Sequence, residues 1–189
     1  DYAIERDTAM RCFQWFRERN MTFACFMQNE IAAFAGEAAA EDIYWCAPWN
    51  DPRAPRILKG EKAVRRFTEG RVNKFVCIER DREQLQALGR RLETLPGLEI
   101  TSSWADNYEL MPQGVSKGRA VKELAEKMGI GPDQVMTVGD FDNDLSMIEY
   151  AGYGIAMGNA TPKVKAAAKY VTLTNDEDGV AAAIRKYVL

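Results

Sequence analysis

The 189-residue chain contains no histidine, and this absence excludes several kinds of active site at once. Ser-His and Cys-His pairs, in which an imidazole activates the nucleophile, cannot be built without it. Most zinc sites also use histidine ligands. The chain has no apolar run near the ~20 residues that a membrane-spanning helix needs, and no secretory signal is visible at its start. We therefore expect no association with a membrane.

The chain also has little excess charge and few cysteines. Twenty-five basic residues face 28 acidic ones, which gives a net charge of −3 and a pI of about 5.2. Because nucleic acids and anionic membranes select basic surfaces, we expect neither as a partner. Cys12, Cys25, Cys46 and Cys77 are widely spaced and form no Cys-x-x-Cys pair. This usage indicates reduced thiols packed in the interior and a cytoplasmic location.

Residues 1–112 have the pattern of a small α+β domain, which ends at the Pro-Gln-Gly of 112–114. Strands that follow one another through short turns pair in antiparallel fashion, so we expect an antiparallel sheet with helices on one face. Asp7 or Thr8 can begin the first helix, and Asp81 can begin the third. The expected strands are 21–27, 30–34, 42–46, 72–79, 98–104 and 107–111. The expected helices are 8–19, 61–69 and 81–92, and residues 49–55 are expected to form a loop.

Residues 113–189 alternate strictly between helices and strands, which predicts a doubly wound parallel sheet and an α/β fold. Ser116 can begin and Gly129 can end the first of these helices. Three strands and four helices are too few to cover both faces and both edges of such a sheet. The expected strands are 135–138, 153–157 and 170–173. Further helices are expected at 144–150 and 178–187, and Thr161 can cap another that Pro162 opens. The expected buried face of the first helix is Ala120, Val121, Leu124, Ala125 and Met128.

The segment 135–144 (VMTVGDFDND) places three carboxylates directly after a buried strand. In open α/β sheets, ligands bind at the carboxyl ends of the strands. Crowded carboxylates repel one another unless a cation neutralises them, and Mg²⁺ prefers one or two carboxylates with water and phosphate oxygens. The alternative is that these residues only cap a helix. A calcium loop is excluded because the required glycine and glutamate are replaced by Leu145 and Ala151.

Lys117 is a second unusual feature, because a cation at the first turn of a helix opposes the helix dipole. A bound anion or a nearby carboxylate would compensate it. The alternative is a solvated surface lysine without a role.

Four segments together resemble the haloacid dehalogenase-like superfamily of phosphohydrolases, and within it the Cof-type sugar-phosphatase branch. They are VSKG at 115–118, VGDFDNDLSM at 138–147, AMGNA at 156–160 and DGV at 178–180. The segment 108–114 is similar to the junction between cap and core in that branch. The resemblance implies an α/β cap domain over residues 1–112 and the C-terminal half of a Rossmann-like core over residues 113–189.

The resemblance also implies roles for individual residues. Lys117 matches the lysine that steadies the nucleophile and the transferring phosphoryl group. Asp140 matches the aspartate that binds Mg²⁺, and Asp144 matches a second acidic residue of the metal site or a partner of the lysine. Asn143 matches a polar position beside the phosphate, whereas Asp142 falls at a variable position. The implied substrate is a small phosphorylated metabolite such as a sugar phosphate.

The chain departs from the family at its beginning. Family members start with a strand ending in Asp-x-Asp, which supplies the nucleophile and the general acid, and a Ser or Thr that binds phosphate follows. Neither segment precedes the cap here, so we expect the 189-residue chain alone to be inactive and its open sheet edge to self-associate or to pair with an N-terminal piece. The alternatives are a degenerate module with a residual cation site and an unrelated response-regulator or nucleotide-binding half-fold. The latter does not explain Lys117 or the Gly158-Asn159 turn.

Overall fold

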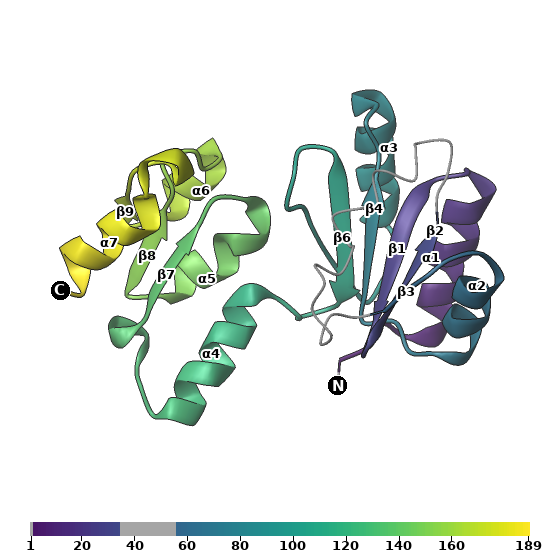
Figure 1. The fold of residues 1–189 in the computed structure, drawn as a ribbon, viewed down its shortest axis with the longest axis horizontal. Coiled ribbons are helices and arrows are strands. Elements are labelled where there is room, and N and C mark those ends of the chain that lie inside the picture. Colours follow the sequence, from purple (N-terminus) through teal and green to yellow (C-terminus); the bar gives the residue numbers. More distant parts are fainter. Residues whose placement is uncertain (1, 35–55) are drawn as a thin grey trace. The chain divides into compact units, whose positions relative to one another are not determined.

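The computed structural model describes residues 2–34 and 56–189, and it divides the chain into two compact units, Asp1–Gln113 and Gly114–Leu189 (Figure 1). The division falls one residue after the boundary expected from the sequence. Each unit has its own sheet. Within the described residues, no helix is both long enough and apolar enough to cross a membrane.

The first unit is a six-stranded sheet in the order β3-β2-β1-β4-β6-β5. Neighbouring strands are antiparallel except β2 and β3, which are parallel. The strands are β1 (Thr22–Met27), β2 (Glu30–Phe34), β3 (Arg56–Leu58), β4 (Lys74–Ile78), β5 (Leu98–Thr101) and β6 (Asn107–Pro112), and the helices are α1 (Arg6–Glu18), α2 (Gly60–Glu69) and α3 (Arg82–Leu92). The sequence did not predict β3, and the predicted strand 42–46 and loop 49–55 lie outside the described residues.

Aromatic side chains form the centre of this unit's core. Phe16 of α1 and Phe67 of α2 are fully buried in one cluster with Phe23 and Phe75 of the sheet. Leu92 of α3 joins the same cluster. The three described helices therefore cover one face of the sheet, as predicted, whereas the expectation of a purely antiparallel sheet is wrong at the parallel pair β2 and β3.

The start of α1 differs from the prediction. Glu5, rather than Asp7 or Thr8, caps the helix, because its carboxylate accepts hydrogen bonds from the backbone N–H groups of Asp7 (3.1 Å) and Thr8 (3.0 Å). These bonds favour the charged form and lower the pKa of Glu5. Glutamate is not among the preferred capping residues, which is why the pattern pointed to the following positions.

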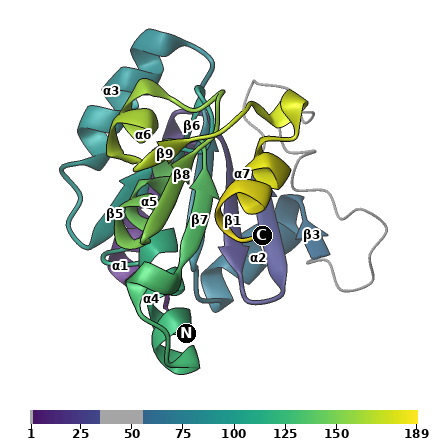
Figure 2. The same ribbon diagram turned by 90° about the vertical axis from the view of Figure 1, so that its left-hand side faces the viewer.

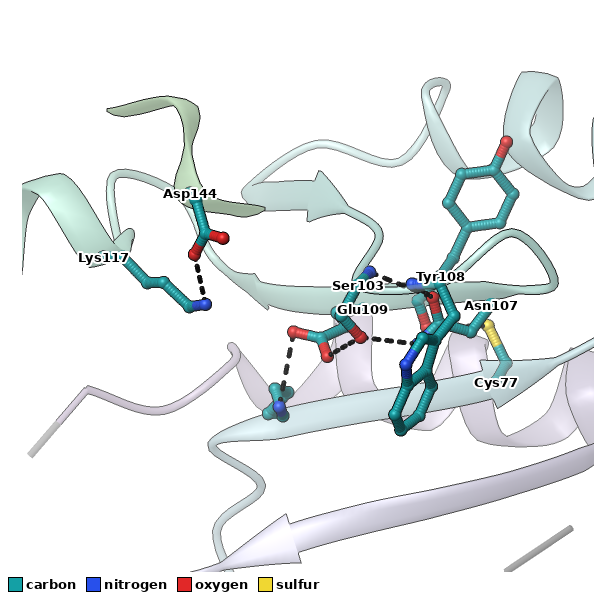
Figure 3. A network of polar contacts seen from close by, with 9 residues as sticks. Cys77, Ser103, Asn107, Tyr108, Glu109, Lys117 and Asp144 are labelled. Atoms are coloured by element: carbon teal, nitrogen blue, oxygen red, sulfur yellow. Dashed lines mark hydrogen bonds and ion pairs between the residues drawn. The ribbon is translucent and has the colours of Figure 1, made fainter. Parts of the chain in front are cut away.

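The turn between β5 and β6 is fixed by one buried amide. Asn107 is 1% exposed, and its Oδ1 accepts from the backbone N–H groups of Ser103 (3.1 Å) and Trp104 (3.0 Å). The hydroxyl of Ser103 donates to Glu109 at 2.8 Å (Figure 3). Lys74 donates to the other oxygen of Glu109 at 3.3 Å. This network satisfies the buried Glu109 carboxylate and joins β4 to β6.

The second unit has a parallel sheet in the order β7-β8-β9 (Figure 2). Its strands are β7 (Met136–Gly139), β8 (Tyr153–Ala156) and β9 (Tyr170–Val171), and its helices are α4 (Lys117–Met128), α5 (Leu145–Tyr150), α6 (Pro162–Ala167) and α7 (Gly179–Tyr187). The α/β fold with a parallel sheet is confirmed. Among the described strands, β7 pairs only with β8, so its other edge is open.

The buried face of α4 was predicted incorrectly in part. Leu124 and Met128 are 58% and 64% exposed, whereas Ala125 is buried. The helix instead turns Gly118 and Ala125 inward. A Cβ on Gly118 would lie 2.3 Å from the carbonyl oxygen of Ser146 in α5, so the two helices approach closely at this glycine. The approach of the two helices therefore selects the side of α4 that carries Gly118 and Ala125. Ala120 is also exposed.

Candidate active site

The candidate site lies at the carboxyl end of β7, where the strand passes into a short 3-10 turn, Asp142–Asp144, and then into α5. Asp140 is exposed, whereas Asp144 is only 4% exposed. The side chain of Asp144 folds back over the end of the strand. A Cβ on Gly139 would lie 2.5 Å from the Cβ of Asp144, so only glycine fits beneath this carboxylate.

The carboxylate of Asp144 binds three partners. Its Oδ1 lies 2.5 Å from the Nζ of Lys117 (Figure 3). Its Oδ2 accepts from the backbone N–H groups of Asp140 (2.9 Å) and Phe141 (3.4 Å). The carboxylate therefore compensates the lysine at the helix N-terminus and fixes the backbone that carries Asp140.

The backbone around Lys117 is fixed by hydrogen bonds of the residues before and after it. Ser116 caps α4 by accepting from the N–H of Arg119 at 3.1 Å, as the sequence predicted. The N–H of Gly118 donates to the hydroxyl of Ser146 at 3.0 Å, which ties the first turn of α4 to α5. The lysine side chain remains half exposed at 50%. It is thus anchored at its base and paired at its tip, yet open to solvent.

Asp140 has one neighbour that the sequence analysis did not assign a role. The amide of Asn159 donates to the Oδ2 of Asp140 at 3.1 Å, and its own Oδ1 accepts from the N–H of Asn175 at 3.0 Å. Asp142 instead pairs with Lys163 at 3.2 Å, and both side chains are solvent-accessible. The signal for Asn159 was present in the segment 156–160, which the resemblance singled out without giving it a function.

The four residues expected at the site differ in their surroundings. Lys117, Asp140 and Asp144 are linked through the carboxylate of Asp144. Asn143 lies in the same 3-10 turn, and its side chain makes no hydrogen bond to any other residue that the structure describes. An unpaired amide and a half-exposed ammonium are both able to donate to an anion.

A magnesium ion would find only part of a ligand set here. Residues 2–34 and 56–189 contain no group of three or more acidic, cysteine or histidine side chains suited to hold a metal. Asp140 nevertheless offers one exposed carboxylate oxygen that is not engaged by Asn159. This donor set fits Mg²⁺ with one protein carboxylate, completed by water and phosphate oxygens.

Two curated relatives show how much of a longer protein the chain matches. A stretch of 92 residues is 50% identical to 5-amino-6-(5-phospho-D-ribitylamino)uracil phosphatase YcsE of Bacillus subtilis, and it covers 49% of this chain and 37% of that protein. A match over 186 residues to endoribonuclease YBEY, chloroplastic, of Arabidopsis thaliana is 26% identical and covers 97% of this chain and 31% of that protein. The chain thus spans about a third of the length of these relatives.

Solved structures share the fold over nearly the whole chain. A haloacid dehalogenase-like hydrolase from B. subtilis superimposes with a TM-score of 0.82 at 27% identity, covering 99% of this chain and 72% of that one. A subclass IIB sugar phosphatase gives a TM-score of 0.81 at 22% identity, covering 99% and 68%, and shows the fold alone. The family of haloacid dehalogenase-like hydrolases matches residues 1–184. The chain therefore belongs to this family of hydrolases.

Proposed function

We propose that the protein is a Mg²⁺-dependent phosphatase that hydrolyses a small phosphorylated metabolite of the sugar-phosphate class. One observation carries the proposal: Lys117 is fixed by the buried Asp144 at the end of β7, while Asp140 is exposed beside it. A cation and a metal-binding carboxylate at one strand end are what phosphoryl transfer requires, because its catalysis depends on positioning and on charge stabilisation. The phosphatase names of relatives such as YcsE support the same reaction class.

Lys117 and Asn143 supply the donors for the phosphoryl group. The ammonium of Lys117 has three protons, and Asp144 accepts one of them, so the others remain for phosphate oxygens. Asn143 adds an uncharged donor from the adjoining 3-10 turn. The bond to Asp144 also limits the motion of the lysine, which lowers the entropy that binding has to offset.

Asp140 supplies the carboxylate for Mg²⁺, which when bound would neutralise negative charge on the phosphate oxygens. We assign Asp144 to the lysine rather than to direct metal ligation, because both of its oxygens already accept hydrogen bonds. The division of roles between these two aspartates follows from their exposure. Asp140 faces solvent, whereas Asp144 is buried.

We further propose that this chain supplies the lysine and metal-binding part of the site without the nucleophile. The resemblance assigns the nucleophile to an Asp-x-Asp segment before the cap, and residues 1–112, which we assign to the cap, contain no Asp-x-Asp themselves. The 189-residue chain alone then binds phosphate esters without hydrolysing them.

The test is a titration of the 189-residue chain with an aryl phosphate and Mg²⁺, in which amide NMR shifts report binding and released phenol reports turnover. We expect the aryl phosphate to bind without turnover and to shift the amide signals of Gly139 and Asp140. Binding is expected to be lost in Lys117→Met and to persist in the matched control Lys122→Met. Binding that ignores Lys117→Met would refute the phosphatase site. Turnover that requires Asp140 would refute the proposal that these 189 residues supply no nucleophile.

Two further proposals concern the surroundings of the protein. The buried thiols of Cys12, Cys25 and Cys77 are free, which suits a cytoplasmic location. Among the described strands only β8 pairs with β7, and we propose that a second copy of the chain or another strand covers the other edge of β7. Light scattering over a dilution series tests this, and a stable monomer at all concentrations would count against self-association.

A further inference from the structure

Asn159 bridges two backbone segments of the second unit through a single side-chain amide. Its Nδ2 donates to the Oδ2 of Asp140 at 3.1 Å, and its Oδ1 accepts from the N–H of Asn175 at 3.0 Å. This pairing determines which way the amide faces. A flipped amide would place an oxygen against the carboxylate and an NH₂ group against the N–H of Asn175, so both bonds would be lost.

The loop that carries Asn159 is itself fastened to the end of β7. The N–H of Met157 donates to the carbonyl of Gly139 at 2.9 Å, and the N–H of Thr161 donates to the carbonyl of Asp140 at 3.0 Å. Backbone bonds on both sides of Asn159 therefore fix its distance from Asp140. The side chain is not a flexible surface group that happens to reach a carboxylate.

The contact leaves the two oxygens of Asp140 unequal. The Oδ2 is engaged by the amide, whereas the Oδ1 is left for a metal ion. The hydrogen bond competes with a cation for Oδ2 and therefore favours ligation through Oδ1 alone. Mg²⁺ requires near-octahedral geometry with single-oxygen ligands, whereas Ca²⁺ readily takes both oxygens of a carboxylate.

We infer that Asn159 is a positioning residue that holds Asp140 for single-oxygen ligation and so favours Mg²⁺ over Ca²⁺. The inference rests on the proposed function, since it assumes that Asp140 binds the metal. Asn159 acts through Asp140 and does not contact the metal itself. Hydrogen bonds that orient a metal ligand are commonly worth a factor of about 10 to 100 in metal affinity.

The test is a pair of NMR titrations of the full 189-residue chain, one with MgCl₂ and one with CaCl₂, which measure affinity without any assay of activity. Asn159→Leu removes both bonds and keeps the branching and the number of side-chain heavy atoms, and Asn159→Ala provides a second variant in case the larger leucine unfolds the unit. Asn175→Ala is the matched control, because it keeps the backbone N–H that Asn159 needs. We expect about a tenfold loss of Mg²⁺ affinity in both Asn159 variants, an equal or higher Ca²⁺ affinity, and no change in the control.

The outcomes separate this inference from the proposed function. If the wild-type chain binds no Mg²⁺, or if Asp140→Asn binds it as well as the wild type, the proposed metal site is wrong. If Asp140→Asn abolishes binding but the folded Asn159 variants keep the wild-type ratio of Mg²⁺ to Ca²⁺ affinity, Asn159 has no positioning role. A parallel loss of affinity for both cations would also overturn the selectivity, because it indicates a general loosening of the loop.

Discussion

Replacement of Asp144 is the perturbation for which the structure gives the clearest magnitude. Asp144→Ala removes the acceptor for the N–H of Asp140, the longer contact to Phe141 and the ion pair with Lys117. A hydrogen bond to a charged group contributes about 1.5–3 kcal/mol, and an ion pair with a half-exposed lysine adds less than about 1 kcal/mol. We therefore expect Asp144→Ala to lower the free energy of unfolding of the second unit by about 3 kcal/mol.

Asp144→Asn separates the two contributions. The asparagine keeps an oxygen for the backbone N–H groups but loses the charge that pairs with Lys117, so we expect a loss of about 1 kcal/mol. Asp142→Ala is the control, since Asp142 pairs with Lys163 at a solvent-accessible position. That change is expected to cost less than about 0.5 kcal/mol.

Hydrogen exchange of the Ile155 amide measures the stability of the second unit, because Ile155 is fully buried in β8. The two units need separate probes, since a chain with two units need not unfold in one transition. All four tryptophans precede residue 114, so tryptophan fluorescence reports the first unit and is expected to stay unchanged. If Asp144→Ala shifts the exchange of Ile155 no more than Asp142→Ala does, the anchoring role of Asp144 is refuted.

Two further predictions concern packing and pH. Gly118→Ala places a methyl group 2.3 Å from the carbonyl oxygen of Ser146. We therefore expect the free energy of unfolding of the second unit, measured by hydrogen exchange, to fall by about 1–3 kcal/mol, and phosphate binding to weaken because the start of α4 is displaced. Wild-type values of both quantities would contradict the close packing of the two helices. Burial raises the pKa of Cys12 and of Cys77 from 9.0 to about 12. As the pH rises, these thiols lose their protons first in the unfolded chain, so we expect the stability of the first unit to hold below pH 8 and to fall above pH 9. The expected loss is about 1 kcal/mol per thiol at pH 10. Tryptophan fluorescence in urea measures this stability, and Cys77→Ala should weaken its pH dependence.

Local sequence signals predicted most helices and strands because they depend on a few neighbouring residues. The caps Asp81, Ser116 and Thr161 each accept hydrogen bonds from the first turn of their helices, as expected. Glu5 was missed because a longer side chain caps less often, so residue preference favoured its neighbours. Such errors move a helix end without changing the fold.

Long-range packing was harder to predict. The apolar pattern of α4 placed Leu124 on the buried face, but the close approach of Gly118 to Ser146 turns another side of the helix inward. At the site, the run of acidic residues and Lys117 were visible in the sequence. The separate environments of Asp140 and Asp144, and the contact from Asn159, depend on strands distant in the chain and appeared only in three dimensions.

The central claim is that Lys117 and Asp140 form one site for phosphate and Mg²⁺. The most direct test is the affinity of the 189-residue chain for inorganic phosphate, measured by calorimetry with and without MgCl₂ and repeated with Asp140→Asn. If the claim holds, Mg²⁺ strengthens phosphate binding in the wild type and has no effect in Asp140→Asn. Phosphate binding that is the same with and without Mg²⁺ in the wild type, or equally strengthened in Asp140→Asn, would contradict it.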